Sequence, residues 1–186
     1  MPKSRPIRSL KPMIKLIPSI AVALVSLVAL SGCASQLDSV KGEYRLPLLN
    51  SSPEQVCSAV QRQVVVSDLM LSDGILLQQS ATRIHAARHH RWSGSLEQQL
   101  QQSVQRVLSE PHCNGELVIQ VMDFYGDDEG NAVVTGHWLY RQDDTQIEQT
   151  FSQRQPLTND GYEALVMALN QAWSDTLKQI KSAIPN

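Results

Sequence analysis

Residues 117–140 read LVIQVMDFYGDDEGNAVVTGHWLY, and this stretch predicts the centre of the fold. In its first part Leu117, Ile119 and Val121 alternate with the side chains of the opposite face, which is the period of a β-strand. Residues 126–131 are polar and acidic, and a second strand resumes over residues 133–140. Two such strands around a short polar segment predict an antiparallel hairpin with an acidic tip.

Two other segments have the period of amphipathic helices. Ser95-Leu96-Glu97-Gln98 is a capping box, and the helix that it opens is expected to run to about Ser109. A second helix is expected from an acidic cap at residues 160–163 to the stop at Pro185. Each helix has one apolar face, formed by Leu96, Leu100, Val104, Val107 and Leu108 in the first and by Tyr162, Leu165, Val166, Leu169, Trp173, Leu177 and Ile180 in the second.

The remaining elements are shorter strands. They are expected over residues 44–48, 58–66, 75–79, 82–87 and 146–153. For the second of these, Ser52-Pro53-Glu54 could instead cap a helix, but its β-branched valines favour a strand. Strands, helix, strands and helix in this order predict an α+β fold, in which a largely antiparallel sheet carries two amphipathic helices packed on one face.

The N-terminus has the pattern of a bacterial lipoprotein signal. A basic start without acidic residues precedes an apolar run, which closes on Leu30-Ser31-Gly32-Cys33. Cleavage would leave Cys33 as the first residue, carrying acyl chains such as palmitate; an uncleaved N-terminal anchor is the alternative. Ala34 rather than Asp follows the cysteine, which indicates the outer membrane and its periplasmic face. The expected organisation is a signal peptide at 1–32, a lipidated tether at 33–43 and one domain at 44–186.

Removing the signal changes the charge of the chain. The 186 residues hold 16 Lys and Arg against 18 Asp and Glu, a net charge of −2. Five of the basic residues belong to the signal, so 16 − 5 = 11 remain against 18 and the mature chain carries −7. An acidic body argues against a nucleic-acid partner, which requires a basic footprint.

Two cysteines remain besides Cys33. Cys57 and Cys113 form an even pair in an oxidising compartment, which favours a disulfide. Neither belongs to a C-x-x-C motif, and no neighbouring histidine forms a convincing nucleophile and base pair. A thiol enzyme is therefore not expected.

Residues 83–92, RIHAARHHRW, are the most basic stretch of the mature chain. His85, His89 and His90 invite a metal site, but the neighbouring arginines would repel a cation and strand alternation sends adjacent histidines to opposite faces. No metal is therefore expected. The preferred interpretation is a basic, partly exposed segment at a strand-to-helix junction. The functional alternative is that this segment is a contact surface for lipid phosphates or an acidic partner, comprising Arg88, His89, Arg91 and Trp92.

The acidic tip is a second candidate contact surface, through Asp127 and Asp128. Together with Glu129 these residues lack the spacing of an EF-hand, so a solvated hairpin tip is preferred to a calcium site. The sequence holds no G-x-S-x-G elbow, P-loop lysine or dinucleotide-binding turn, so neither an enzyme nor a cofactor is expected. The three tryptophans are expected to be core or interface anchors: Trp92, Trp138 and Trp173.

Three segments together resemble the PqiC-type auxiliary lipoproteins of ABC-type and MCE-linked envelope transport. These are Tyr44-Arg45-Leu46-Pro47, then Arg91-Trp92 with Ser95-Leu96, then Val133-Val134-Thr135-Gly136-His137-Trp138 followed by Asp160-Gly161-Tyr162 and Ala172-Trp173-Ser174. The resemblance covers nearly all of the mature chain. It implies an outer-membrane lipoprotein that forms a ring of identical subunits and docks on the periplasmic tunnel of a PqiB-like MCE-domain protein, helping lipids to cross between two membranes and maintaining membrane integrity.

The leading expectation is therefore a non-catalytic structural subunit. The alternative is a monomeric, periplasm-facing lipid-binding or chaperone-like lipoprotein that holds an acyl chain between sheet and helices. A ring requires apolar surface at subunit contacts, whereas a carrier requires an internal apolar cavity.

Overall fold

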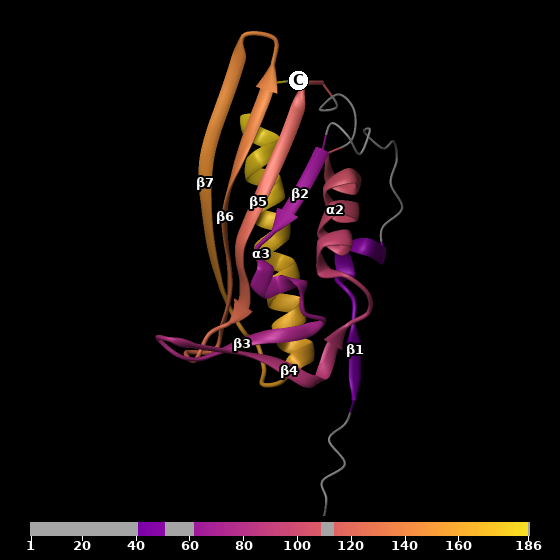
Figure 1. The fold of residues 1–186 in the computed structure, drawn as a ribbon, viewed down its shortest axis with the longest axis vertical. Coiled ribbons are helices and arrows are strands. Elements are labelled where there is room, and N and C mark those ends of the chain that lie inside the picture. Colours follow the sequence, from indigo (N-terminus) through magenta and orange to yellow (C-terminus); the bar gives the residue numbers. More distant parts are fainter. Residues whose placement is uncertain (1–40, 51–61, 109–113, 186) are drawn as a thin grey trace, which may run out of the picture. The chain divides into compact units, whose positions relative to one another are not determined.

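The computed structural model describes residues 41–50, 62–108 and 114–185 of the chain. Strands and short 3-10 turns form the first part, followed by a helix, three long strands and a final helix (Figure 1). In chain order the elements are β1 (Gly42–Tyr44), η1 (Pro47–Asn50), β2 (Arg62–Val66), η2 (Asp68–Leu71), β3 (Gly74–Ser80), β4 (Arg83–Trp92), α2 (Leu96–Val107), β5 (Glu116–Gly126), β6 (Asn131–Gln142), β7 (Thr145–Pro156) and α3 (Tyr162–Ala183).

The strands form a seven-stranded sheet in the order β1-β4-β3-β5-β6-β7, with β2 paired beside β5. The pairs β3–β4, β5–β6 and β6–β7 are antiparallel, and the pairs β1–β4, β2–β5 and β3–β5 are parallel. The predicted α+β class is confirmed. The sheet is mixed, however, because β1 and β2 join strands that follow them after long connections, and such connections permit parallel pairing.

The hairpin predicted from residues 117–140 is confirmed, as the antiparallel pair β5–β6. β5 and β6 pair in register from Glu116 and Arg141 down to Gly126 and Ala132, with one irregularity between Val121 and Asp123. β7 pairs with β6 along its whole length. The turn before β7 contains Asp143 at φ 49°, a left-handed conformation that aspartate tolerates better than most residues.

α3 lies against one face of the sheet, and α2 lies beside β2 (Figure 1). A buried hydrogen bond from Trp173 of α3 to Ser103 of α2 joins the two helices. The core between them is apolar, and all three tryptophans lie in it: Trp92, Trp138 and Trp173 are 4%, 2% and 0% exposed. Trp173 of α3 packs edge-on against Phe151 of β7 at 6.4 Å between ring centroids. The expectation that the tryptophans are core anchors is confirmed for burial.

Several predicted boundaries need correction. The strand expected at residues 44–48 ends at Tyr44, because Pro47 opens the 3-10 turn η1. The strand expected at residues 82–87 continues to Trp92, since β3 pairs with β4 as far as Arg91. Ser95 does cap α2, accepting a hydrogen bond from the Gln98 amide at 3.4 Å. α3 begins after Gly161 at φ 103° without a side-chain cap, so the predicted acidic cap is wrong.

Of the two structures weighed for residues 58–66, the strand is confirmed over Arg62–Val66. Its earlier residues, with the helix cap considered at Ser52, lie outside the described part of the chain. Within the part that is described, no helix combines the length and apolar character needed to cross a membrane.

Candidate functional site

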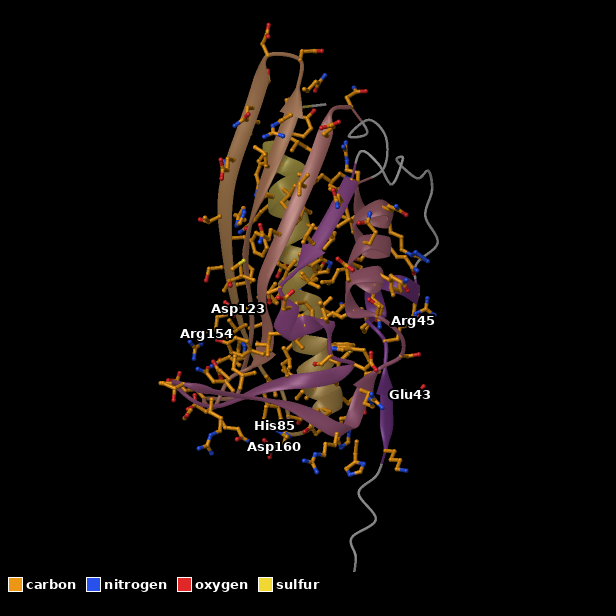
Figure 2. The ribbon with its side chains drawn as sticks, viewed as in Figure 1. Glu43, Arg45, His85, Asp123, Arg154 and Asp160 are labelled. Carbon is orange, nitrogen blue, oxygen red and sulfur yellow. The ribbon has the colours of Figure 1, made fainter. Side chains whose placement is uncertain are left out.

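The basic stretch of the sequence lies on β4, at the end of the sheet where β1 joins it. β1 runs parallel to β4, with Gly42 opposite His90 and Tyr44 opposite Trp92. This pairing brings Lys41 and Glu43 beside the exposed side chains of Arg88, His89 and Arg91. Figure 2 places Glu43 of β1 and His85 of β4 at this end of the sheet.

These side chains border a shallow groove of about 610 Å³. Its lining consists of Lys41, Gly42, Glu43, Arg88, His89 and Arg91. Arg91 also forms an ion pair with Asp73 at 2.9 Å, and both side chains are 56% exposed. An exposed pair of this kind contributes little stability, so Arg91 remains available for contacts with another molecule.

His90 points away from this groove and belongs to an aromatic cluster that joins three elements. Its ring stacks on Tyr162 of α3 at 3.8 Å between centroids, and its Nδ1 lies 2.9 Å from the Tyr44 hydroxyl of β1. Burial, with a smaller contribution from Glu163, raises the pKa of Tyr44, and burial likewise raises the pKa of Tyr162. His89 lines the groove and His90 does not, but both border a second hollow together with His85 and Arg88.

Trp92 is not part of the surface on which the sequence placed it. Its side chain is 4% exposed and packs against Phe124 with 6.0 Å between ring centroids. The reason is the extension of β4, which carries the tryptophan into the core before α2 begins. The candidate surface therefore consists of Arg88, His89 and Arg91 together with Lys41, which the sequence analysis missed because the β1–β4 pairing leaves no local pattern.

At the tip of the β5–β6 hairpin, Asp127 stabilises the turn. Its carboxylate accepts hydrogen bonds from the backbone amides of Glu129 at 3.0 Å and Asn131 at 2.7 Å, and pairs with Arg154 of β7 at 2.5 Å. The Asp127 side chain is only 3% exposed, whereas Asp128 is exposed. Contacts with a partner at this tip would therefore fall to Asp128 rather than to both aspartates.

The charge of Asp127 is favoured by these bonds. Burial alone would raise the pKa of its carboxyl, but the hydrogen bonds from Asn131 and Glu129 and the charge of Arg154 outweigh burial and hold that pKa below its ordinary value. Arg154, labelled in Figure 2, also reaches Glu129 at 2.7 Å. One cation thus holds two acidic residues of the tip.

A small apolar pocket opens between this tip and the start of α3. It has a volume of about 190 Å³ and is lined mainly by Leu77, Leu157, Tyr162 and Leu165. Sites for small ligands usually measure roughly 300–1,000 Å³. Among the residues that the structure describes, no group of three or more His, Cys, Asp or Glu is arranged to hold a metal ion.

Comparison with known proteins identifies the family to which the chain belongs. The family model for the ABC-type transport auxiliary lipoprotein component matches residues 50–112 and 110–181. The chain belongs to this family. The matched residues include β4 with its basic side chains, both helices and the long β5–β6–β7 meander.

Curated relatives of this auxiliary lipoprotein match along most of its length. The intermembrane transport lipoprotein PqiC of Escherichia coli (strain K12) is 28% identical over 180 residues, which cover 87% of this chain and 96% of the relative. PqiC of Shigella flexneri matches with the same identity and coverage.

Two solved structures share the fold. One, the crystal structure of an uncharacterized protein, superposes with a TM-score of 0.69 at 26% identity and covers 78% of this chain and 99% of its own. The other, a protein of Xanthomonas campestris, has a TM-score of 0.58 at 13% identity, covering 75% of this chain and 92% of its own, and shows likeness of fold alone.

The three cysteines of this auxiliary lipoprotein lie outside the described residues. Described residues next to two of them are held together, however. The Arg62 side chain, at the start of β2, donates hydrogen bonds to the carbonyl oxygens of Asn114 at 3.0 Å and Gly115 at 2.8 Å. Arg62 follows Cys57 by five residues, and Asn114 directly follows Cys113.

Proposed function

We propose that this chain is a non-catalytic lipoprotein subunit of an intermembrane lipid transport system, anchored in the outer membrane through Cys33 with its domain on the periplasmic side. Identical subunits form a ring, and the ring docks on the periplasmic tunnel of an MCE-domain protein. The observation that carries this proposal is the match to PqiC, the intermembrane transport lipoprotein, over 87% of the chain and 96% of that relative.

The use of the polar side chains supports a structural role. Asp127 stabilises a turn, His90 packs between two tyrosines, and Arg62 binds backbone carbonyl groups. Each of these three polar side chains is engaged in contacts that hold the structure together. The exposed Arg88, His89 and Asp128 serve as contact residues at the β4 surface and the hairpin tip.

The alternative function, a carrier of single acyl chains, is less well supported. Such a carrier needs an internal cavity large enough for a lipid tail, and the apolar pocket beside Leu77 and Leu165 measures only about 190 Å³. The core is filled instead by large side chains, such as Trp138 and Tyr140 of β6 and Trp173 of α3, which are at most 2% exposed.

Native mass spectrometry tests the two functions against each other. The mature chain is exported with Cys33→Ser, so that no lipid drives or prevents association. A closed set of identical subunits is the expected result. A monomer that carries phospholipid would contradict the proposal and favour the carrier, and a lipid-free monomer that also fails to associate on membranes would contradict the ring.

Co-purification tests docking on the tunnel. The lipidated chain is expressed with the MCE-domain protein encoded in the same cell and isolated through a tag on that protein. Retention of the chain at a fixed ratio is expected. The matched control is the chain with Cys33→Ser, which should lose membrane anchoring but retain docking in detergent. Isolation of the tagged MCE-domain protein without the chain would contradict docking.

A further inference from the structure

Cations gather where the chain enters the domain. The basic face, defined here as Lys41, Arg88, His89 and Arg91, lines one groove at the β1–β4 edge. Arg83 extends the same charge along β4 and is also exposed. The mature chain as a whole carries a net charge of −7, so this face is positive on an acidic protein. Such asymmetry indicates a surface for an anionic partner.

The cations of the basic face are only partly neutralised by their neighbours. Within residues 41–50, 62–108 and 114–185, neither Lys41 nor Arg88 takes part in an ion pair, whereas Arg91 is paired with Asp73. Glu43 is the single acidic side chain in the lining of the groove. The charges of Lys41 and Arg88 are therefore free to meet anions from outside.

The position of Lys41 in the chain limits how far this face can lie from the lipid. Lys41 follows Cys33 by eight residues, and an extended chain spans at most about 3.5 Å per residue, so the distance is at most about 28 Å. Lys41 directly precedes β1, which pairs with β4 at His90, Arg91 and Trp92. Lys41 is therefore the member of the basic face that lies nearest to Cys33 along the chain, and it is the first residue that the structure describes.

We infer that the basic face binds the phosphate groups of the phospholipid membrane in which Cys33 is anchored, and so sets the orientation of the domain on that membrane. This inference rests on the proposed lipidation at Cys33. Arginine suits the role because its planar guanidinium group forms paired hydrogen bonds with phosphate oxygens. Basic residues next to a membrane anchor add to its hold on an anionic surface. The acidic remainder of the domain is repelled by the same surface, which favours one orientation.

Vesicle binding of the unlipidated chain tests this inference. The mature chain with Cys33→Ser is mixed with vesicles of phosphatidylglycerol and phosphatidylethanolamine, or of phosphatidylcholine alone, and bound protein is measured by sedimentation. Binding to the anionic vesicles and its loss at high salt are expected. Lys41→Gln combined with Arg88→Gln should weaken binding to the anionic vesicles about twenty-fivefold, since each cation near an anionic surface contributes about fivefold.

The matched control removes two cations from the opposite end of the domain. Arg141 lies near the β6–β7 turn and Lys178 in the C-terminal part of α3, and both are exposed. Arg141→Gln with Lys178→Gln changes the net charge equally and should leave vesicle binding within twofold. Arg88→Lys, which retains the charge but loses the paired hydrogen bonds of the guanidinium group, should bind anionic vesicles better than Arg88→Gln and less well than the unsubstituted chain.

Three results would overturn the inference. The first is equal binding of the unsubstituted chain to anionic and neutral vesicles. The second is equal loss in the control and in the Lys41 and Arg88 variant, which would reflect net charge alone. The third is unchanged vesicle binding in that variant together with lost co-purification with the MCE-domain protein, which would make the basic face a protein contact. These results would not contradict the proposed ring or its docking on the tunnel. Native mass spectrometry and co-purification of the unsubstituted chain test those two proposals separately.

Discussion

At the scale of single residues, two glutamine side chains of α2 act as partners for backbone groups. The Gln101 carboxamide accepts a hydrogen bond from the Val64 amide at 2.8 Å and donates one to the Arg62 carbonyl oxygen, both on β2. Gln99 accepts from the Leu46 amide at 3.0 Å and donates to the Ser93 carbonyl oxygen at 3.4 Å. Gln101 thus occupies the edge of β2 as a further strand would, which protects that edge from pairing with another chain.

Asp127 gives a pH-dependent prediction. Its folded-state pKa lies below the ordinary value of 3.8, so its contribution to the free energy of unfolding is complete above about pH 4 and is lost as pH falls through the folded-state pKa. Asp127→Asn keeps an acceptor for the two turn amides but loses the charge that pairs with Arg154. We expect it to lower the free energy of unfolding by about 1–2 kcal/mol at pH 7.

Urea denaturation at pH 7, 5 and 3 measures this difference. It should be equal at pH 7 and 5 and should shrink at pH 3, because below 3.8 the carboxyl of Asp127 binds a proton more readily in the unfolded chain than in the folded chain. Asp128→Asn, an exposed neighbour with the same change in charge, is the control and should change stability by less than about 0.5 kcal/mol. A difference that stays constant down to pH 3 would show that the Asp127 charge is not what stabilises the turn.

At the scale of elements, a buried polar chain joins the two helices. The indole Nε1 of Trp173 in α3 donates to the Ser103 hydroxyl of α2 at 2.6 Å, and that hydroxyl donates to the Leu100 carbonyl oxygen at 2.6 Å. Both side chains are fully buried. The bond therefore sets how α2 and α3 lie beside each other over the sheet, because the indole N–H has no water to replace its acceptor.

Ser103→Ala is expected to lower the free energy of unfolding by about 2 kcal/mol, because it leaves the Trp173 N–H buried without its acceptor. A double-mutant cycle isolates this effect: in a Trp173→Phe background, which lacks the N–H, Ser103→Ala should have a much smaller effect. Ser182→Ala, at an exposed serine of α3, is the control. Equal losses with tryptophan and with phenylalanine at position 173 would rule out the hydrogen bond as the cause. Thermal and urea unfolding provide the measurements.

Element type was predictable from the sequence wherever one side of an element is buried. The period-2 pattern of β5 and β6 and the helical period of α3 are consequences of burial on one face, and both were confirmed. Polar residues with a structural role were not predictable in this way. Gln101 lies outside the apolar face predicted for its helix, and its bonds to β2 leave no mark in the sequence, because a glutamine that bonds to a strand edge has the same spacing as one that faces water.

The candidate site, too, was predictable only in part from the sequence. The basic strand and the acidic tip were visible in the sequence as charged runs, and the structure places Arg88, His89 and Asp128 on the surface. The pairing of β1 with β4 was not visible, because parallel partners distant in sequence leave no mark on either segment. Lys41 was therefore not predicted as part of the basic face. Trp92, expected both as a surface contact and as a core or interface anchor, lies in the core.

At the scale of the whole molecule, the predicted bridge between Cys57 and Cys113 would close a long loop across the sheet. The hydrogen bonds from Arg62 to Asn114 and Gly115 hold the described neighbours of both cysteines together, which supports this pairing. We expect a disulfide, and its reduction should lower the free energy of unfolding by roughly 2–4 kcal/mol.

Mass spectrometry after alkylation, with and without reductant, tests the bridge in the Cys33→Ser background. No alkylated cysteine is expected before reduction and two are expected after it. The chain with Cys57→Ser and Cys113→Ser is the control, and its unfolding should be insensitive to reductant. Two alkylated thiols in the untreated sample would contradict the pairing.

The short edge strand β1 also determines how the domain would respond to a mechanical load. It is held to β4 by three paired residues and by the Tyr44 hydroxyl at His90, and the proposed anchor precedes it in the chain. A pull on that anchor would first peel β1 from the sheet, releasing about 10 Å of chain at about 3.3 Å per residue. The long strands β5, β6 and β7 follow the β1–β4 pair in the chain and would not carry this load first. If the two membranes moved apart, the β1–β4 pairing would break first, and the core of the domain would stay folded.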